Sequence, residues 1–505
     1  MAQLQRSSGL LLHPTSLPGP YGIGDLGKSA YQWIDFMVNA GQTIWQILPL
    51  GPTGYGNSPY QATSVFAGNP LLLDLEDLAA RDLIPGEALE HHRAFPDHRV
   101  DFPAVIDWKL PLVLSTRERF HERADADTRS RYAAYCEENG ARWLNDYALF
   151  MSIKNRQGGA SWTDWPEPLR LRHPEAVAAA EADLADDIES HKVVQFLFFE
   201  QWSRLRAYAN EKGVAIMGDI PIYVTYDSAE VWGNQDRFAL DGEGKPTEVA
   251  GVPPDYFSET GQLWGNPLYR WDRMAENDFA WWVERIRVTT TFVDWVRIDH
   301  FRGFEAFWAV PFGEETAMNG TWKKAPGVAL FETIRRELGD LPIVVEDLGF
   351  ITREVRELRD RFGFPGMKIL QFAFGGDPSE PFLPHNYDPN CIVYTGSHDN
   401  DTTLGWFNSA PENEREFCLR YLGGHQEDIT QSLVRLAMGS TAILCIFPVQ
   451  DVLSLGPDAR MNRPGQPDGN WEWRLQPGQL ESRHADRMAD LAHMFNRVPG
   501  REDGE

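Results

Sequence analysis

Eight short apolar stretches recur along this chain, and segments with helical periodicity lie between most of them. The spacing predicts strands at residues 9–13, 43–50, 214–221, 293–298, 341–345, 367–374, 392–395 and 441–447. Helical patterns follow several of these stretches, for example at 29–39, 331–338 and 353–362. Strands that alternate with helices pair in parallel, because each helix returns the chain to the same end of the sheet. Eight such units predict a closed (β/α)8 TIM barrel of the α/β class.

The stretch from residue 70 to residue 212 departs from this rhythm. Charged amphipathic helical patterns dominate it, as at 142–150 and 174–211, and it contains no repeat. A (β/α)8 barrel needs about 250 residues, so a chain of 505 residues has room for an insertion. We predict a catalytic barrel formed by 1–69 and 213–505, with long loops at its C-terminal face. The mostly helical insertion subdomain at 70–212 would follow the second strand.

A doubly wound open sheet is the main alternative fold. Sheets of that kind that bind nucleotides open a helix with a GxGxxG motif or a P-loop. Neither motif opens a helical segment here. The barrel is therefore favoured.

The charge balance of the chain narrows the range of partners. With 74 acidic and 47 basic residues the formal net charge is -27, and such a surface repels nucleic acid and anionic membranes. Aromatic residues make up 12% of the chain and include 18 tryptophans. Amphipathic aromatic side chains stack against flat, weakly apolar ligands. The composition favours a neutral substrate such as a sugar.

The cysteines and the N-terminal segment bear on location. Four cysteines lie far apart without any CxxC motif, which predicts neither a disulfide framework nor a zinc site and suggests a reducing compartment. The first apolar run, residues 9–12, is shorter than the core of a secretion signal, and no segment approaches the length of a membrane span. We expect a cytoplasmic location.

The fourth predicted strand carries two charged residues near its end. Arg297 and Asp299 are two positions apart, so their side chains leave the same face of an extended strand. Such a pair is costly in a core unless it binds something. An aspartate beside a guanidinium stays ionised and can attack carbon. The alternative is a structural ion pair at the border of a strand and a loop.

Carboxylates follow four of the predicted strands, and these are Asp219, Asp299, Glu346 with Asp347, and Asp399 with Asp401. The C-terminal ends of barrel strands face one cleft. A helix cap or a buried ion pair is the favoured interpretation for Asp347 and Asp401. Two chemistries need the whole cluster. Metal-assisted hydrolysis would take oxygen ligands from 398–401, and glycosyl transfer needs an ionised nucleophile and a protonated acid. The aromatic residues favour the second.

Seven segments together resemble glycoside hydrolase family 77, the 4-α-glucanotransferases also called amylomaltases or disproportionating enzymes. They are residues 13–22, 51–61, 218–221, 251–257, 297–303, 346–349 and 398–401. The resemblance extends from residue 9 to beyond Trp471, and the helical insertion carries the least of it. Ser397, where the family often has threonine, is a small departure.

The resemblance implies a retaining transfer of 1,4-α-D-glucan segments. The donor would be a maltooligosaccharide or amylose, and the acceptor the 4-hydroxyl of glucose or of another glucan. Asp299 would be the nucleophile that forms a covalent glucosyl-enzyme, and Glu346 the acid/base. Asp399 would stabilise the distorted donor sugar. The apolar run 343–345 before Glu346 supports this division, because desolvation raises the pKa of a carboxyl group. No cofactor or metal is implied.

The resemblance also implies a set of substrate-binding residues. Those that line or close the donor pocket would be Ser58, Tyr60, Asp219, Arg297, His398 and Asn470. Tyr55 would belong to a second glucan-binding groove outside the active site.

The segment 251–267 is predicted to be a loop with three aromatic residues. As a lid, its Tyr256 and Trp264 would exclude water and stack an acceptor chain, which favours transfer over hydrolysis. The alternative is a long loop packed on the barrel without such a function.

Three other functions stay open at this point. An α-amylase-like hydrolase would convert maltotriose mainly into shorter products. A metal-dependent hydrolase would lose activity with a chelator. A catalytically silent glycan-binding protein is disfavoured by Asp299, Glu346 and Asp399, because a binding protein has no reason to bury an acid pair.

Overall fold

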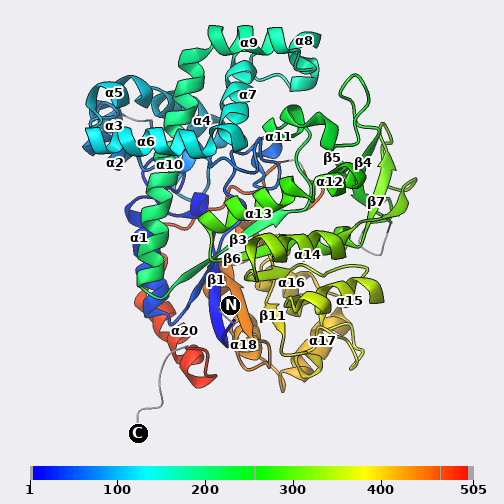
Figure 1. Ribbon diagram of the computed structural model, residues 1–505. Coiled ribbons are helices and arrows are strands. Elements are labelled where there is room, and N and C mark those ends of the chain that lie inside the picture. The colour runs from blue at the N-terminus through cyan, green and yellow to red at the C-terminus, as the bar shows by residue number, and fades with distance from the viewer. Residues whose placement is uncertain (1–3, 92, 255–257, 467, 499–505) are drawn as a thin grey trace.

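The computed structural model describes residues 4–91, 93–254, 258–466 and 468–498. A parallel sheet of eight strands lies at its centre, in the order β10-β11-β12-β1-β2-β3-β6-β9 (Figure 1). The strands are β1 Ser7–Leu11, β2 Ile44–Gln46, β3 Ala215–Pro221, β6 Trp295–Asp299, β9 Ile343–Val345, β10 Gly366–Ile369, β11 Cys391–Tyr394 and β12 Leu444–Pro448. Each predicted strand is confirmed, and the sequential order is that of a (β/α)8 barrel.

Successive side chains along each barrel strand point alternately to opposite faces of the sheet, and they therefore belong to two different apolar clusters. On β11, Ile392 and Tyr394 belong to one cluster while Val393 belongs to the other. The first cluster receives residues from all eight strands, among them Leu11 and Met217, and fills the barrel interior. The second cluster joins the strands to the surrounding helices. This period of two fixes which residues of each strand face the barrel axis.

The barrel closes between β9 and β10 through backbone and side-chain hydrogen bonds. Val345 N–H donates to Pro365 O at 3.0 Å, and one ladder bond further along Met367 N–H donates to a carboxylate oxygen of Asp347 at 2.7 Å. Arg359 binds the other oxygen of Asp347 at 2.6 Å. The Asp347 carboxylate therefore takes the place of a strand carbonyl at this seam, which is a structural role of the kind that the sequence favoured for it.

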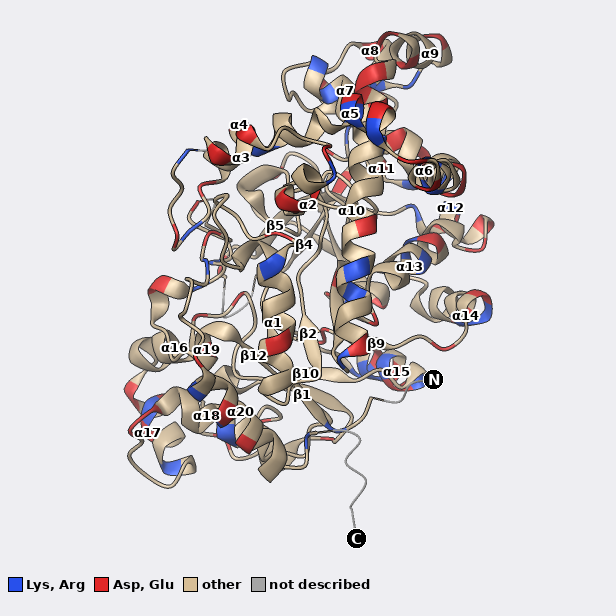
Figure 2. Ribbon diagram, turned by 90° about the vertical axis from the view of Figure 1, so that its left-hand side faces the viewer, with Lys and Arg blue, Asp and Glu red and all other residues tan. Residues whose placement is uncertain are grey.

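Helices cover the outside of the barrel, and charged residues lie mainly on them rather than on the central strands (Figure 2). They are α1 Lys28–Asn39, α11 Ala229–Gly233, α12 Trp271–Glu276, α13 Ala280–Phe292, α14 Gly327–Leu338, α15 Arg353–Phe362, α16 Thr403–Ser409, α17 Glu412–Tyr421, α18 Ile429–Met438, α19 Val449–Val452 and α20 Ser482–Met494. None of the helices in the described part of the chain has the length and apolarity needed to cross a membrane.

A layer of helices lies between β2 and β3 in the chain and above the barrel in Figure 1. Its members are α2 Leu75–Ala80, α3 Glu87–Glu90, α4 Phe102–Leu114, α5 Thr116–Arg123, α6 Ala126–Asn139, α7 Asn145–Arg156, α8 Glu167–Arg170, α9 Pro174–Asp183 and α10 Ala185–Glu211. Helix α10 extends from this layer down the side of the barrel to α1. Trp202 of α10 donates to the backbone oxygen of Phe292, 2.8 Å away, at the start of the connection into β6.

A second sheet of four antiparallel strands stands beside the barrel, in the order β5-β4-β7-β8. The strands are β4 Glu248–Val252, β5 Gln262–Pro267, β7 Ala306–Pro311 and β8 Thr321–Lys324. The prediction of a loop over 251–267 is therefore wrong at both ends, which pair as a hairpin. The composition of that segment indicated a loop, whereas its pairing depends on β7, about fifty residues further on.

Candidate active site

Strand alternation turns the charged residues of β6 toward the barrel axis. Trp295 packs in the interior cluster and Val296 packs outward, so Arg297 and Asp299 continue the inner face. The guanidinium Nη1 of Arg297 lies 2.9 Å from Asp299 Oδ1 and 2.5 Å from Asp219 Oδ2. Asp219 stands directly beside Arg297, on the neighbouring strand β3. One cation thus binds two carboxylates.

The environment of Arg297 makes this ion pair strong. Its side chain is only 3% exposed, so solvent screens the charges weakly. Burial alone lowers its pKa, but the charges of Asp219 and Asp299 raise it well above the ordinary value. The ion pair between Arg297 and Asp299 expected from the sequence is present.

The same alternation separates Glu346 from Asp347 at the end of β9. Val344 packs in the barrel interior and Val345 packs outward, so Glu346 faces the axis whereas Asp347 faces the seam with β10. Glu346 accepts two backbone hydrogen bonds, from His300 N at 2.8 Å and from Leu348 N at 2.7 Å. These bonds fix the orientation of its carboxyl group.

His300 reaches Glu346 through an unusual backbone conformation. Its φ and ψ are 50° and 50°, in the left-handed region, which is rare for a residue with a side chain. This turn directs the N–H group that follows Asp299 toward the carboxyl oxygen of Glu346. The backbone between the two candidate catalytic residues is thereby held in one arrangement.

The pKa of Glu346 differs from that of an ordinary glutamate. Burial raises the pKa to about 8, the charge of Asp299 adds to the increase, and Arg297 and the Leu348 N–H oppose it. Near pH 7 the group is therefore mostly protonated and can donate a proton. Asp299, with a guanidinium at 2.9 Å, lies in the opposite kind of environment.

Two adjacent cavities of about 500 Å³ each occupy the C-terminal mouth of the barrel. Asp299, His300, Asp399 and Trp264 line both, so the cavities meet at these residues. Glu346 lines only one of them, which we call the glutamate cavity. The other, which we call the tyrosine cavity, is lined by Ser58, Tyr55, Tyr60, His398 and Asn470.

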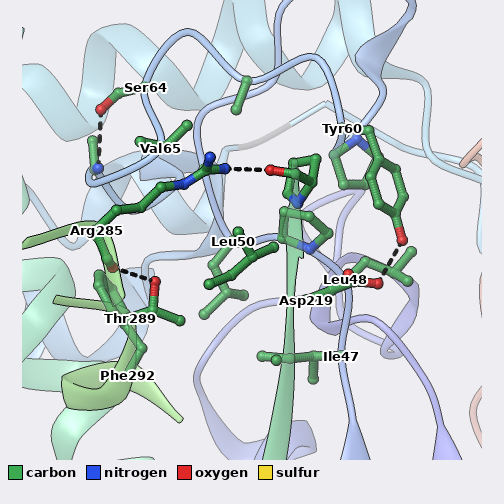
Figure 3. Close-up of a pocket in the computed structure, with 18 of the residues that line it drawn as sticks. Ile47, Leu48, Leu50, Tyr60, Ser64, Val65, Asp219, Arg285, Thr289 and Phe292 are labelled. Carbon is green, nitrogen blue, oxygen red and sulfur yellow. Dashed lines mark hydrogen bonds between the residues drawn. The ribbon is translucent and has the colours of Figure 1, made fainter. Parts of the chain in front are cut away.

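An aromatic cluster forms one wall of the tyrosine cavity. The rings of Tyr60 and His398 stack with their centres 5.0 Å apart, and Trp471 lies 5.9 Å from each. Tyr60 O–H donates to Asp219 Oδ2 at 2.8 Å, as Figure 3 shows. The hydrogen bond joins the loop 51–61 to the Arg297 cluster.

Tyr60 also lines a small cavity of about 70 Å³ (Figure 3). The buried Arg285 of α13 reaches across this cavity and donates to Pro221 O at 2.6 Å. Ser64 donates to Glu230 at 2.6 Å and accepts from the backbone after it, which secures the end of the Tyr60 loop.

Asp399 lies where the two cavities meet, at the end of the β11 loop. Asn462 Nδ2 donates to its Oδ1 at 2.6 Å, and Arg460 donates to its backbone oxygen at 2.8 Å. Both partners come from the loop after α19. Asp401, by contrast, accepts from Thr402 N at 2.8 Å and lies 3.8 Å from Arg460. No group of three metal-ligating side chains occurs among the described residues.

Three further residues predicted to bind glucan are Asn470, Tyr55 and Tyr256. Asn470 uses its amide within its own loop, accepting from Arg463 N at 2.8 Å and donating to Gln466 O at 2.7 Å. Tyr55 is 77% exposed and borders the tyrosine cavity, and its place in a second glucan-binding groove stays a prediction. Tyr256 lies outside the described residues.

Sequence reasoning missed three exposed aromatic residues in the glutamate cavity, which are Trp322, Phe350 and Phe372. Phe350 directly follows the segment 346–349, so its place beside Glu346 was readable from the sequence. Trp322 reaches the cavity from β8, and only the second sheet brings it there.

Known proteins are similar to this chain over nearly its whole length. Residues 12–481 match a family model described as 4-alpha-glucanotransferase. The chain is 51% identical over 504 residues to a 4-alpha-glucanotransferase of Thermus thermophilus, covering 98% of this chain and 100% of the relative. A 4-alpha-glucanotransferase of Synechocystis is 49% identical, with 98% of each chain covered. Among solved structures, an amylomaltase from Streptococcus agalactiae in complex with acarbose superposes with a TM-score of 0.94 at 38% identity, covering 98% of this chain and 100% of that one.

Proposed function

The chain belongs to the 4-alpha-glucanotransferase family, glycoside hydrolase family 77, and we propose that its substrates are maltooligosaccharides and amylose, with glucose or a glucan as acceptor. It is a glucan-transferring enzyme built on a (β/α)8 barrel. The observation that carries the mechanism is the pair of unlike carboxyl groups at the barrel mouth. Asp299 is paired with Arg297, and Glu346 has a pKa of about 8.

The first half of the reaction breaks the donor glucan. Asp299 attacks the anomeric carbon, and a bond forms between its carboxylate oxygen and that carbon. Glu346 gives its proton to the glycosidic oxygen, so the bond to the departing chain breaks and a neutral sugar hydroxyl leaves. Arg297 lies beside Asp299 and, through its second contact with Asp219, joins β6 to β3.

The second half transfers the glucan. Glu346, now ionised, takes the proton of the acceptor 4-hydroxyl, whose oxygen attacks the anomeric carbon and displaces Asp299. Two displacements at one carbon retain its configuration. Retaining enzymes hold their two carboxyl groups about 5–5.5 Å apart, and we expect that separation between Asp299 and Glu346 in a glucan complex. A separation in the inverting range would count against the mechanism.

The two cavities separate donor from acceptor. The departing chain occupies the side from which its oxygen is protonated, and Glu346 lines only the glutamate cavity. The acceptor enters where the departing chain leaves, so the glutamate cavity is the acceptor side. The tyrosine cavity then holds the donor, with Tyr60, His398, Ser58 and Asn470 along it. Asp399, where the cavities meet, contacts the sugar whose bond is broken.

Incubation with maltotriose tests the proposal. Transfer produces glucose together with a ladder of longer maltodextrins, whereas an α-amylase-like hydrolase produces mainly shorter sugars. A parallel incubation with a chelator tests a metal-dependent hydrolase, which would lose activity. A ladder that forms equally with and without chelator supports the transferase.

We also propose a cytoplasmic location. The four cysteines are free thiols, and three of them are buried, as is usual for proteins of a reducing compartment. The division into a barrel and a helical insertion subdomain at 70–212 is likewise a proposal, supported by the uninterrupted series of helices from α2 to α10.

A further inference from the structure

Two of the three exposed aromatic rings in the glutamate cavity belong to Phe350 and Trp322. Phe350 is 73% exposed, and Trp322 is 39% exposed. Both line the cavity that contains Glu346. Large apolar side chains left in solvent at the same cavity mark a binding surface. Neither ring takes part in the mechanism described above.

Arg302 holds the two rings together. Its guanidinium carbon lies 3.8 Å from the centre of the Trp322 ring and 5.9 Å from that of Phe350. The same guanidinium donates to the backbone oxygen of Phe350 at 2.5 Å. Arg302 is buried, so this cation is available to the rings and not to solvent. The backbone of Phe350 is therefore fixed although its ring is exposed.

The position of the rings relative to Glu346 indicates which sugar unit they contact. Glu346 acts on the hydroxyl that joins the transferred glucan, so the first acceptor unit lies against Glu346, His300 and Asp399. Phe350 is four residues beyond Glu346, past the left-handed turn at Gly349, where the chain reaches the rim. A ring at the rim is placed for the next unit outward.

We propose that Phe350 and Trp322, joined by Arg302, form a stacking surface for the second glucose unit of the acceptor. Phe350 thereby makes the enzyme prefer maltose and longer chains to glucose as acceptors. The C–H face of a glucose unit packs on an aromatic ring, and glucose alone is too short to reach this surface. The inference rests on the proposed transferase function and adds the acceptor preference to it.

α-Maltotriosyl fluoride, as donor, separates acceptor binding from donor cleavage. Asp299 attacks the anomeric carbon, the carbon–fluorine bond breaks and fluoride leaves without a proton from Glu346. Glu346, which kept its proton in this step, releases it to solvent, and the ionised carboxylate then takes the proton of the acceptor 4-hydroxyl, whose oxygen displaces Asp299. Product analysis with glucose or with maltose as acceptor gives kcat/KM for each. The ratio of the two values is the readout.

We expect the unmodified enzyme to use maltose about tenfold more efficiently than glucose, the size of one aromatic stacking contact. Phe350→Ala should bring the ratio close to one by lowering kcat/KM for maltose. Phe350→Tyr keeps an aromatic ring and should keep the ratio near that of the unmodified enzyme. Trp322→Ala should also lower the ratio, because it removes the second ring. Phe312→Ala is the matched control, since Phe312 is 51% exposed and lines neither cavity, and it should leave the ratio unchanged.

The outcomes distinguish this inference from the function on which it rests. If the unmodified enzyme transfers to neither sugar, the transferase function is wrong and the stacking surface with it. If it transfers to both with equal efficiency, or if Phe350→Ala leaves the preference for maltose intact, the transferase stands and the stacking surface is wrong. A melting temperature close to that of the unmodified enzyme shows that each variant is folded.

Discussion

At the scale of single residues, the chemistry depends on two carboxyl groups in unlike surroundings. Asp299 has a guanidinium at 2.9 Å, which stabilises its negative charge. Among the described residues, Glu346 has no such partner at hydrogen-bond distance, and it accepts hydrogen bonds from two backbone N–H groups. In the proposed mechanism, environment therefore assigns the roles of nucleophile and acid to residues of nearly the same chemistry.

Asp299→Ala tests the nucleophile. Without a carboxylate at this position no covalent intermediate forms, and we expect the rate of transfer from maltotriose to fall on the order of 10⁴-fold or more. Product formation over time measures the loss, and the melting temperature shows whether the variant is folded. Substantial residual transfer would remove Asp299 from this role.

The pH dependence of kcat/KM tests the acid. Glu346 must carry a proton to cleave the donor, and its pKa is raised to about 8. The active form is therefore present below that pH and is lost as the pH rises through it. We expect kcat/KM for maltotriose to decline above about pH 8, and this decline to be absent for α-maltotriosyl fluoride, which needs no acid. A decline that begins near the ordinary pKa of a glutamate would contradict the assignment.

At the scale of elements, the seam between β9 and β10 positions the acid. The β9 end is tied to β6 through Glu346 N–H and Ile298 O at 2.9 Å, and to β10 through the carboxylate of Asp347. The carboxylate of Asp347 can lie against Gly366 because glycine lacks a side chain. A Cβ atom at position 366 would lie 2.6 Å from a carboxylate oxygen of Asp347. The proposed acid, Glu346, is thus adjacent in the chain to the residue that supports barrel closure, Asp347.

Asp347→Ala should destabilise the barrel. The substitution leaves Met367 N–H without its acceptor and Arg359 without its buried partner, and we expect a loss of about 1–3 kcal/mol in the free energy of unfolding. Asp360→Ala is the control, because Asp360 also pairs with Arg359 but is largely exposed, and its loss should stay within about 0.5 kcal/mol. Urea unfolding of both variants measures the difference. Equal effects would show that the Asp347 carboxylate does not support the seam.

The β4–β5 hairpin brings Trp264 to the place where the cavities meet. Its ring packs edge-on against His300, with the centres 4.7 Å apart. We expect Trp264→Ala to admit water beside the covalent intermediate and to raise hydrolysis relative to transfer. The ratio of reducing ends released to longer maltodextrins formed measures this, and an unchanged ratio would rule out a shielding role. Tyr256 was assigned the same role from the sequence, and Tyr256→Ala tests it separately.

At the scale of the whole molecule, the barrel was predictable and the second sheet was not. Each barrel strand is a short apolar run that its own composition reveals, and sequential parallel order follows from the helices between them. In the second sheet, β8 is exposed throughout, so no apolar pattern marks it. The pairing of the strands in this sheet joins segments far apart in the chain, which local composition does not encode.

The same distinction explains what was predictable of the site. Arg297, Asp299 and Glu346 follow from strand alternation, since each lies at the end of a barrel strand. The contact of Asn462 with Asp399, and the place of Trp322 in the glutamate cavity, depend on loops and strands that fold against the barrel from elsewhere. The catalytic roles of Asp299, Glu346 and Asp399 remain predictions, as do the substrate contacts of the predicted binding residues.

The most direct test of the account is to identify the side chain that carries the sugar. In Glu346→Gln, α-maltotriosyl fluoride can still load the enzyme, but the acceptor is no longer deprotonated, so the covalent intermediate should accumulate. Mass spectrometry of a protease digest should then find one maltotriosyl group on the peptide that contains Asp299, specifically on that aspartate. A sugar attached to another residue, or no attached sugar while fluoride is released, would contradict the central claim.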